Sequence, residues 1–287
     1  MQKLIIPLVL SIMFSCTSPL KKENVIIKNE NVEIAYTETG NADTTLLFIH
    51  GWAINKEFWQ NQIDEFSKRY HVIAIDLGGH GASGKNRNSW TIPDFANDVI
   101  ATIQQLHLNK VVLIGHSMSG EVMLQVVNNL PKLIIGIIGI DNLTSIDPNP
   151  MKPEQIKPIN EWFTAMEKNY DSVAADYCKK GLFPPEYKDT TSINRVIKTV
   201  THTDQTIAIA TLKSLMDFSR NDSALLGNTK LRLNLVISSG NTVDSASLNK
   251  YCKSGYAIRK IEGTGHYPMI EKPVEFNTAL QETLDHL

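Results

Sequence analysis

The chain has 287 residues, of which 42% are hydrophobic and 20% are charged. A chain of this size and composition can bury a full core, and α/β folds often keep this length as one domain. The formal net charge of -2 provides no basic field for collecting nucleic acid. We therefore expect one domain with insertions and no nucleic-acid partner.

The N-terminal residues have the pattern of an export signal. Lys3 is followed by an apolar run over residues 4–14, which is too short to span a bilayer as a helix. The run ends at Ser15-Cys16 and resembles the lipobox of bacterial lipoproteins, although Met13 stands where leucine is usual. The resemblance implies a lipid on Cys16 and an exported bacterial protein anchored to a membrane, facing the periplasm or the cell exterior. An ordinary cleaved signal peptide with an incidental cysteine is the alternative.

The other two cysteines are Cys178 and Cys252. An oxidising compartment permits a disulfide between them, but their spacing does not establish one. Neither lies in a Cys-x-x-Cys pattern or a histidine cluster, so we predict no metal site.

Apolar runs rich in β-branched residues are typical of strands that are covered on both faces, as in a parallel sheet. They lie at 46–49, 72–75, 111–114, 133–140, 233–237 and 256–258. Ahead of them, 25–27 and 32–36 predict two short strands around an Asn-rich turn. Helical patterns separate the runs, for example Phe95, Val99, Ile103 and Leu106 on one side of a helix. This alternation predicts a doubly wound, mostly parallel α/β sheet.

The segment from about 145 to 228 departs from the alternation. It is poor in strand patterns, contains several prolines and carries helical patterns. We therefore predict a helical cap inserted after the strand at 133–140. The predicted organisation is a lipoprotein signal peptide over residues 1–15, a linker over 16–30, and one domain over 31–287 that includes this cap.

Residues 115–120, with the sequence GHSMSG, form the sharpest motif. They directly follow the run at 111–114 and directly precede a helical stretch. A nucleophile elbow needs this context, because a sharp turn from strand to helix projects the serine Oγ from the sheet edge. Ser119 replaces the second glycine of G-x-S-x-G but is small enough for the turn. The motif resembles the α/β-hydrolase family, which implies that fold and Ser117 as nucleophile.

Two further segments resemble the same family. His50-Gly51-Trp52 follows the first core strand, where the family places one oxyanion-hole amide. The resemblance implies the backbone N–H groups of Trp52 and Met118 as the two donors. Residues 76–84 resemble the family's D-x-x-G-x-G-x-S loop, for which we expect a structural role.

The sequence Gly263-Thr264-Gly265-His266 follows the last predicted strand, where the family carries its base. The resemblance implies that His266 takes the Ser117 proton and later returns it to the leaving group. We expect His116 to shape the pocket beside the nucleophile.

The acid that orients His266 is ambiguous. The usual family position follows the strand at 233–237, but this chain lacks the aspartate found there in relatives. Either Asp244 reaches in from a rearranged loop, or the acid is Asp141, which ends the strand at 133–140. We favour Asp141, because a strand end fixes a carboxylate better than a loop does. A site with no working acid is the third alternative.

These residues together predict a serine hydrolase that cleaves a small ester, amide or thioester through an acyl-enzyme on Ser117, without a cofactor. A cofactor-free perhydrolase, a C–C bond hydrolase and a degenerate, non-catalytic binding module are the alternatives. Haloalkane dehalogenases and epoxide hydrolases of this fold use an aspartate nucleophile, so Ser117 argues against them. Apolar side chains of the cap indicate either an acyl or alcohol pocket or the cap's own core. They are Trp162, Phe163, Met166, Leu182, Phe183 and Met216.

Overall fold

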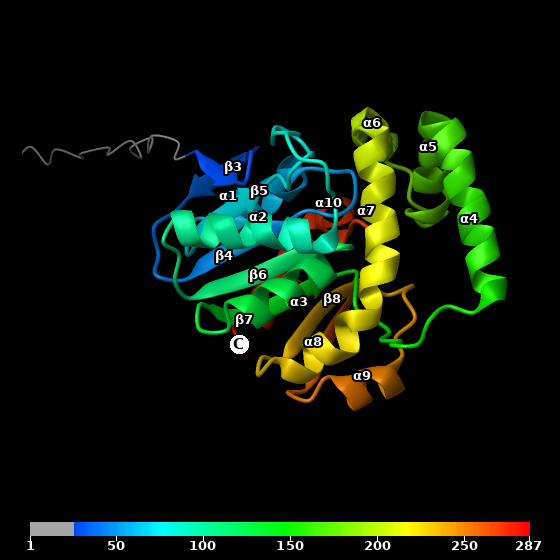
Figure 1. The fold of residues 1–287 in the computed structure, drawn as a ribbon. Helices are drawn as coiled ribbons and strands as arrows, with labels where there is room; N and C mark the ends of the chain where they lie inside the picture. The colour runs from blue at the N-terminus through cyan, green and yellow to red at the C-terminus, as the bar shows by residue number, and fades with distance from the viewer. Residues whose placement is uncertain (1–25) are drawn as a thin grey trace, which may run out of the picture.

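The computed structural model describes residues 26–287 (Figure 1). These residues form a central sheet between two layers of helices, and a further group of helices stands at one end of the sheet. The signal peptide predicted over residues 1–15, Cys16 and most of the predicted linker lie outside the described residues.

The central sheet has seven strands in the order β3-β5-β4-β6-β7-β8-β9. Neighbouring strands are parallel except β3, which runs antiparallel to β5. The fold-class prediction of a doubly wound, mostly parallel sheet is confirmed. The strands are β3 (Tyr36–Thr39), β4 (Thr45–Ile49), β5 (His71–Ile75), β6 (Val111–His116), β7 (Ile134–Ile140), β8 (Leu233–Ser238) and β9 (Tyr256–Ile261).

The predicted strand at 32–36 is divided in the structure. β1 (Ile27–Asn29) and β2 (Val32–Ile34) form a separate two-stranded antiparallel sheet, whereas Tyr36 begins β3 and pairs with Ile75 of the main sheet. The alternation of apolar residues runs on from Val32 and Ile34 to Tyr36. The division therefore follows from the different strands with which the two pieces pair.

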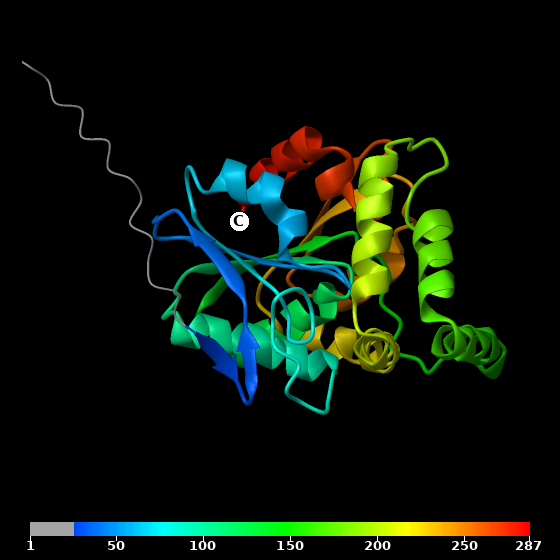
Figure 2. The same ribbon diagram turned by 90° about the horizontal axis from the view of Figure 1, so that it is seen from above.

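Helices cover both faces of the sheet. Figure 2 shows α1 and α11 on one side and α2 and α3 on the other. The helix α2 begins with a capping box between Thr91 and Asp94. Of its predicted apolar stripe, Phe95, Val99 and Ile103 are fully buried, and Leu106, the C-cap residue, is partly buried. The helices of these layers and their connections are η1 (Lys56–Trp59), α1 (Gln60–Phe66), α2 (Ile92–Gln105), α3 (Ser119–Asn129), α8 (Asp222–Asn228), α9 (Ser245–Tyr251), α10 (Pro268–Glu271) and α11 (Pro273–Leu284).

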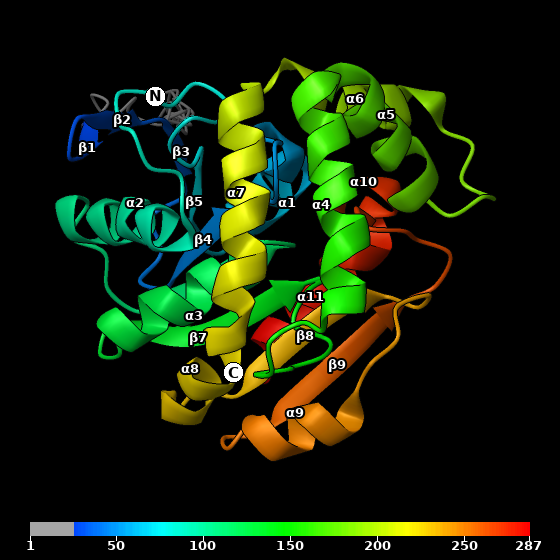
Figure 3. The same ribbon diagram turned by 45° about the vertical axis from the view of Figure 1, so that its right-hand side comes forward.

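The insertion between β7 and β8 is helical, and its first four helices stand together beyond the sheet (Figure 3). They are α4 (Pro153–Lys168), α5 (Tyr170–Gly181), α6 (Thr190–His202) and α7 (Gln205–Phe218), followed by η2 (Ser219–Asn221). We call α4 to α7 the cap. The next helix, α8, packs against α3, so the chain has returned to the sheet layer before residue 228.

Two findings concern membrane-spanning helices and cysteines within the described residues. Within residues 26–287, every helix is too short or too polar to cross a membrane. Cys178 in α5 and Cys252 after α9 are both buried free thiols, so the disulfide that export would permit is not formed between them.

Candidate active site

Ser117 occupies the turn between the end of β6 and the start of α3. Its φ of 52° lies in the left-handed region, which costs a non-glycine residue on the order of 1–3 kcal/mol. Its N–H donates to the carbonyl of Ile140 at 2.9 Å, which ties the turn to β7. The strand, turn and helix that a nucleophile elbow requires are therefore all present around Ser117.

His266 lies between the serine and an aspartate. Its Nδ1 is 2.6 Å from Asp141 Oδ2, and its Nε2 is 2.9 Å from Ser117 Oγ. An ionised carboxylate only accepts hydrogen bonds, so Nδ1 carries the ring proton and Nε2 is left to accept the serine hydroxyl. In this arrangement the imidazole can remove the proton from Ser117.

Asp141 follows β7 directly and is 8% exposed. Its Oδ1 accepts the backbone N–H of Ser238 at 2.9 Å and the side-chain amide of Asn241. Burial would raise the pKa of Asp141, but the hydrogen bond and charge of His266, with the Ser238 N–H, outweigh burial and lower the pKa below its ordinary value. Asp141 therefore stays ionised at neutral pH.

Asp244 does not reach His266. It is the exposed N-cap residue of α9, and its carboxylate accepts the N–H groups of Ala246 and Ser247 at 3.1 Å. This corrects the alternative that placed Asp244 beside the histidine. The physical reason is that the carboxylate satisfies the free amides of its own helix, while the end of β7 already presents Asp141.

The segment predicted to supply one oxyanion donor lies against the elbow. β4 and β6 are parallel neighbours with Ile49 paired to Gly115, so both strands end at the same sheet edge. A Cβ on Gly51 would lie 3.1 Å from the Cβ of Ser117. Trp52 follows Gly51, and Met118 begins the turn into α3, so the residues of both predicted donors flank Ser117.

Ser119, which replaces a family glycine, donates its hydroxyl to the carbonyl of His50. It thereby ties the elbow to the segment that carries Trp52. Asn142 holds the elbow from the other side, because its Nδ2 donates to the carbonyls of Gly115 and Ser117, both at 2.9 Å. Asn142 belongs to no motif in the sequence, and its place directly after Asp141 at a strand end is the one signal that could have indicated it.

His116, which we expected to shape the pocket beside the nucleophile, packs against the ring and the backbone of His266. The two ring centroids are 4.7 Å apart, and His116 Nε2 donates to the His266 carbonyl at 2.7 Å. Burial, aided by the charge of His266, lowers the pKa of His116 to about 3. His116 is therefore a neutral hydrogen-bond donor that holds the backbone of His266.

The loop at 76–84 has the structural role expected of it. Asp76 accepts the backbone N–H of Lys56 at 2.7 Å and that of Ala82 at 3.0 Å. Gly81 has a φ of 52°, and a Cβ there would lie 2.4 Å from the Asp76 carboxylate. Glycine is required at that position because the chain folds closely over the buried carboxylate.

The cap touches both sides of the candidate site. The indole Nε1 of Trp52 donates to the Ala208 carbonyl of α7 at 2.8 Å, and the N–H of His266 donates to the Leu182 carbonyl at 2.8 Å. Among the apolar cap residues singled out from the sequence, four are buried and two, Trp162 and Met216, are partly buried. The four are Phe163, Met166, Leu182 and Phe183.

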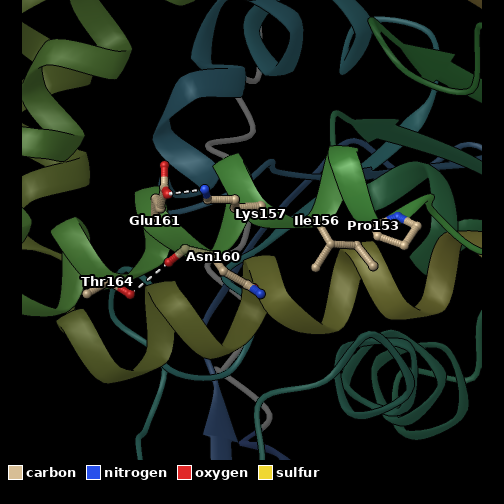
Figure 4. A pocket seen from close by; sticks show the side chains of 6 residues that line it. All are labelled: Pro153, Ile156, Lys157, Asn160, Glu161 and Thr164. Atoms are coloured by element: carbon tan, nitrogen blue, oxygen red, sulfur yellow. Dashed lines mark hydrogen bonds and ion pairs between the residues drawn. The ribbon is translucent and has the colours of Figure 1, made fainter.

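A pocket of about 500 Å³ lies along α4. Figure 4 shows that its lining side chains come from successive turns of that one helix, with Glu161 paired to Lys157. None of the three residues of the Ser117 hydrogen-bond chain lines it. Across residues 26–287, moreover, no cluster of three or more His, Cys, Asp or Glu side chains is placed to hold a metal ion.

Residues 46–279 fit the sequence model described as the alpha/beta hydrolase family. This range contains Ser117, Asp141 and His266.

Two curated relatives match the chain over shorter stretches. The chain is 38% identical over 99 residues to an (E)-2-((N-methylformamido)methylene)succinate hydrolase of Acinetobacter baylyi, covering 34% of this chain and 37% of that protein. It is 36% identical over 97 residues to a non-heme chloroperoxidase of Burkholderia pyrrocinia, covering 33% and 35%. The chain thus matches about a third of the length of these relatives.

Solved structures match over nearly the whole chain. An esterase from Thermogutta terrifontis superposes with a TM-score of 0.77 at 19% identity, covering 91% of this chain and 97% of that one. An enol-lactonase from Burkholderia xenovorans superposes with a TM-score of 0.75 at 16% identity, covering 89% and 98%. At these identities the similarity shows the fold alone.

Proposed function

The chain belongs to the alpha/beta hydrolase family, and we propose that it is a serine hydrolase that cleaves a small ester, amide or thioester through an acyl-enzyme on Ser117. One observation carries the proposal. His266 bonds Ser117 Oγ through Nε2 at 2.9 Å and Asp141 through Nδ1 at 2.6 Å, which is the geometry of a nucleophile, a base and an orienting acid.

The first half of the reaction forms the acyl-enzyme. As Ser117 Oγ bonds to the substrate carbonyl carbon, its proton passes to His266 Nε2, and Asp141 stabilises the imidazolium. The backbone N–H groups of Trp52 and Met118 donate hydrogen bonds that stabilise the negative charge developing on the carbonyl oxygen. In other enzymes, loss of one such donor costs about 3–4 kcal/mol.

The acyl-enzyme is complete when the tetrahedral intermediate collapses. The scissile bond breaks, and His266 gives its proton to the departing alcohol, amine or thiol. In the second half, water attacks the acyl-enzyme and His266 accepts a proton from it. The bond between the acyl carbon and Ser117 Oγ then breaks, His266 returns the proton to Oγ, and a carboxylic acid leaves. These steps need no cofactor.

A fluorophosphonate probe tests the nucleophile directly. We expect wild-type protein to be labelled on Ser117 and Ser117→Ala to remain unlabelled. On a panel of p-nitrophenyl esters of graded chain length, Ser117→Ala should lose turnover by up to roughly 10⁶-fold while keeping its thermal unfolding temperature. More than a tenth of wild-type activity in this variant contradicts the mechanism. Wild-type protein that is neither labelled nor active on the panel supports the non-catalytic binding module.

A cofactor-free perhydrolase is the second candidate, and the match to a protein named as a non-heme chloroperoxidase favours it. In that reaction hydrogen peroxide replaces water in the attack on the acyl-enzyme, and a peroxyacid leaves. Ester hydrolysis and peroxyacid formation should be measured side by side with the same acyl donor. A higher kcat with peroxide would make the perhydrolase the better description.

We also propose that the protein is exported and anchored to a membrane by lipid on Cys16. The support is the sequence over residues 3–16, with its charge, apolar run and terminal cysteine. Acyl chains contribute about 0.8 kcal/mol per buried CH₂, so Cys16→Ser should move the protein from the membrane fraction to the soluble fraction. Unchanged precursor processing in the presence of globomycin contradicts the proposal.

A further inference from the structure

Glu271 makes an unusual pair of contacts around the candidate base. It is the last residue of α10, and it is 9% exposed. Its Oε2 accepts the N–H of Gly265 at 2.7 Å, and its Oε1 accepts the N–H of Tyr267 at 2.8 Å. One carboxylate therefore accepts hydrogen bonds from the backbone N–H groups of the residues on both sides of His266.

Contacts from several elements hold the segment that carries His266. It lies between β9 and α10 and belongs to neither a helix nor a strand. The N–H of His266 itself bonds the Leu182 carbonyl of the cap, and its carbonyl accepts from His116. Glu271 is the side chain that accepts the amide N–H groups on both sides of the histidine, whereas Ser238 and His116 bind the carbonyls of the same two peptide units. Glu271 does so from the sheet body rather than the cap.

The chemistry of the contact requires a carboxylate. A carboxylate offers two acceptor oxygens, one for each amide N–H. A glutamine of the same length offers one acceptor, and its NH₂ group would face the second amide donor. Replacing Glu271 with glutamine therefore breaks one of the two bonds while leaving the volume of the side chain almost unchanged.

We propose that Glu271 is a positioning residue, which sets the imidazole of His266 between Asp141 and Ser117 by holding the Gly265 and Tyr267 amides. This inference deepens the proposed serine-hydrolase function and rests on it. Glu271 acts on the backbone, so it affects proton transfer and not the binding of substrate. A shift of about 1 Å in a catalytic group lowers the rate by about 10²-fold, which indicates the size of the effect.

The test compares Glu271→Gln with Glu275→Gln in the full chain. Glu275 is exposed on α11, four residues further on, so it provides the same chemical change away from the site. For Glu271→Gln we expect kcat to fall about 10- to 100-fold with KM within twofold of wild type. For Glu275→Gln we expect both parameters unchanged. Wild-type kcat in Glu271→Gln overturns the inference.

Glu271→Asp separates positioning from packing. Aspartate keeps two acceptor oxygens on a shorter stem, so its kcat should lie between those of wild type and Glu271→Gln, again with unchanged KM. Equal loss in both variants, accompanied by a raised KM, would show a general packing defect and overturn the inference. If Glu271→Gln does not fold, the test rests on Glu271→Asp alone. A wild-type kcat in Glu271→Asp then contradicts the proposal.

The failure of this inference is distinguishable from failure of the proposed function. If Ser117→Ala is inactive and unlabelled while Glu271→Gln keeps wild-type kcat, the serine-hydrolase function stands and the role of Glu271 is wrong. If Ser117→Ala keeps its activity, the function itself is wrong, and the inference about Glu271 falls with it.

Discussion

The carboxyl edge of the sheet and the cap are held in different ways. At the edge, Ser117 and Asp141 both have φ values just above 50°, and backbone bonds to neighbouring strands maintain these conformations. In the cap, the helix α4 buries Phe163 and Met166 and exposes most of its other residues. The candidate reacting groups thus lie at strand ends, and the cap meets the site through the Leu182 and Ala208 carbonyls and through aromatic contacts such as that of Phe183 with Tyr267. Substitutions in each region test how far the two depend on each other.

The largest effect is expected from the acid at the sheet edge. Asp141→Asn should lower kcat by about 10⁴-fold, because an amide favours the wrong tautomer of His266 and does not stabilise the imidazolium. Asp244→Asn is the matched control and should stay within about twofold of wild type, since asparagine also caps a helix well. Steady-state kinetics on one ester measures both. Equal and mild effects would instead support a degenerate site.

A smaller effect is expected where the cap meets the histidine segment. A Cβ on Gly265 would lie 2.5 Å from the Leu182 carbonyl oxygen, so Gly265→Ala must push the cap and this segment apart. We expect kcat to fall about 10- to 100-fold, since His266 moves with the segment.

The matched control for Gly265→Ala is Gly227→Ala in α8. A Cβ at Gly227 would meet nothing within 4 Å, and alanine favours the helix, so kcat should not change. Wild-type kcat in Gly265→Ala would show that the cap can move without disturbing the base.

The next prediction concerns stability, and we expect no effect on activity. It concerns two carboxyl groups where the chain returns from the cap to the sheet layer. There α8 brings Asp222 to Glu121 of α3, and both carboxyl groups are buried. Burial raises the pKa of both groups, and the charge of Asp222 raises that of Glu121 further. The folded chain therefore holds more protons than the unfolded chain above the ordinary carboxyl pKa of about 4, so stability falls as the pH rises from there.

Asp222→Asn should flatten this pH dependence. It removes one of the two charges, so the free energy of unfolding near pH 8 should rise on the order of 1 kcal/mol above wild type, with kcat unchanged. Urea denaturation near pH 5 and near pH 8 measures the effect, and Asp171→Asn on the exposed face of α5 is the control. If the free energy of unfolding falls between pH 5 and pH 8 as steeply in Asp222→Asn as in wild type, the Glu121–Asp222 pair does not cause the fall.

Much of the fold was predictable because its signals are local. The runs at 46–49 and 111–114 are apolar throughout, as strands covered on both faces require, and they became β4 and β6. The strand at 32–36 was predicted as one piece because β2 and β3 continue the same alternation. Their separation depends on pairing partners from distant parts of the chain, which alternation does not encode.

For the candidate site, the sequence predicts Ser117 as nucleophile and His266 as base, and the two side chains lie 2.9 Å apart in the structure. Ser117 and His266 stand in short glycine-flanked turns that follow strands, and such turns have recognisable residues. The choice between Asp141 and Asp244, and the places of Asn142 and Glu271 at the site, come from the tertiary structure. The physical reason is that each of these side chains bonds a backbone or side-chain group of another segment. The position of that group is fixed only once the strands and turns have packed.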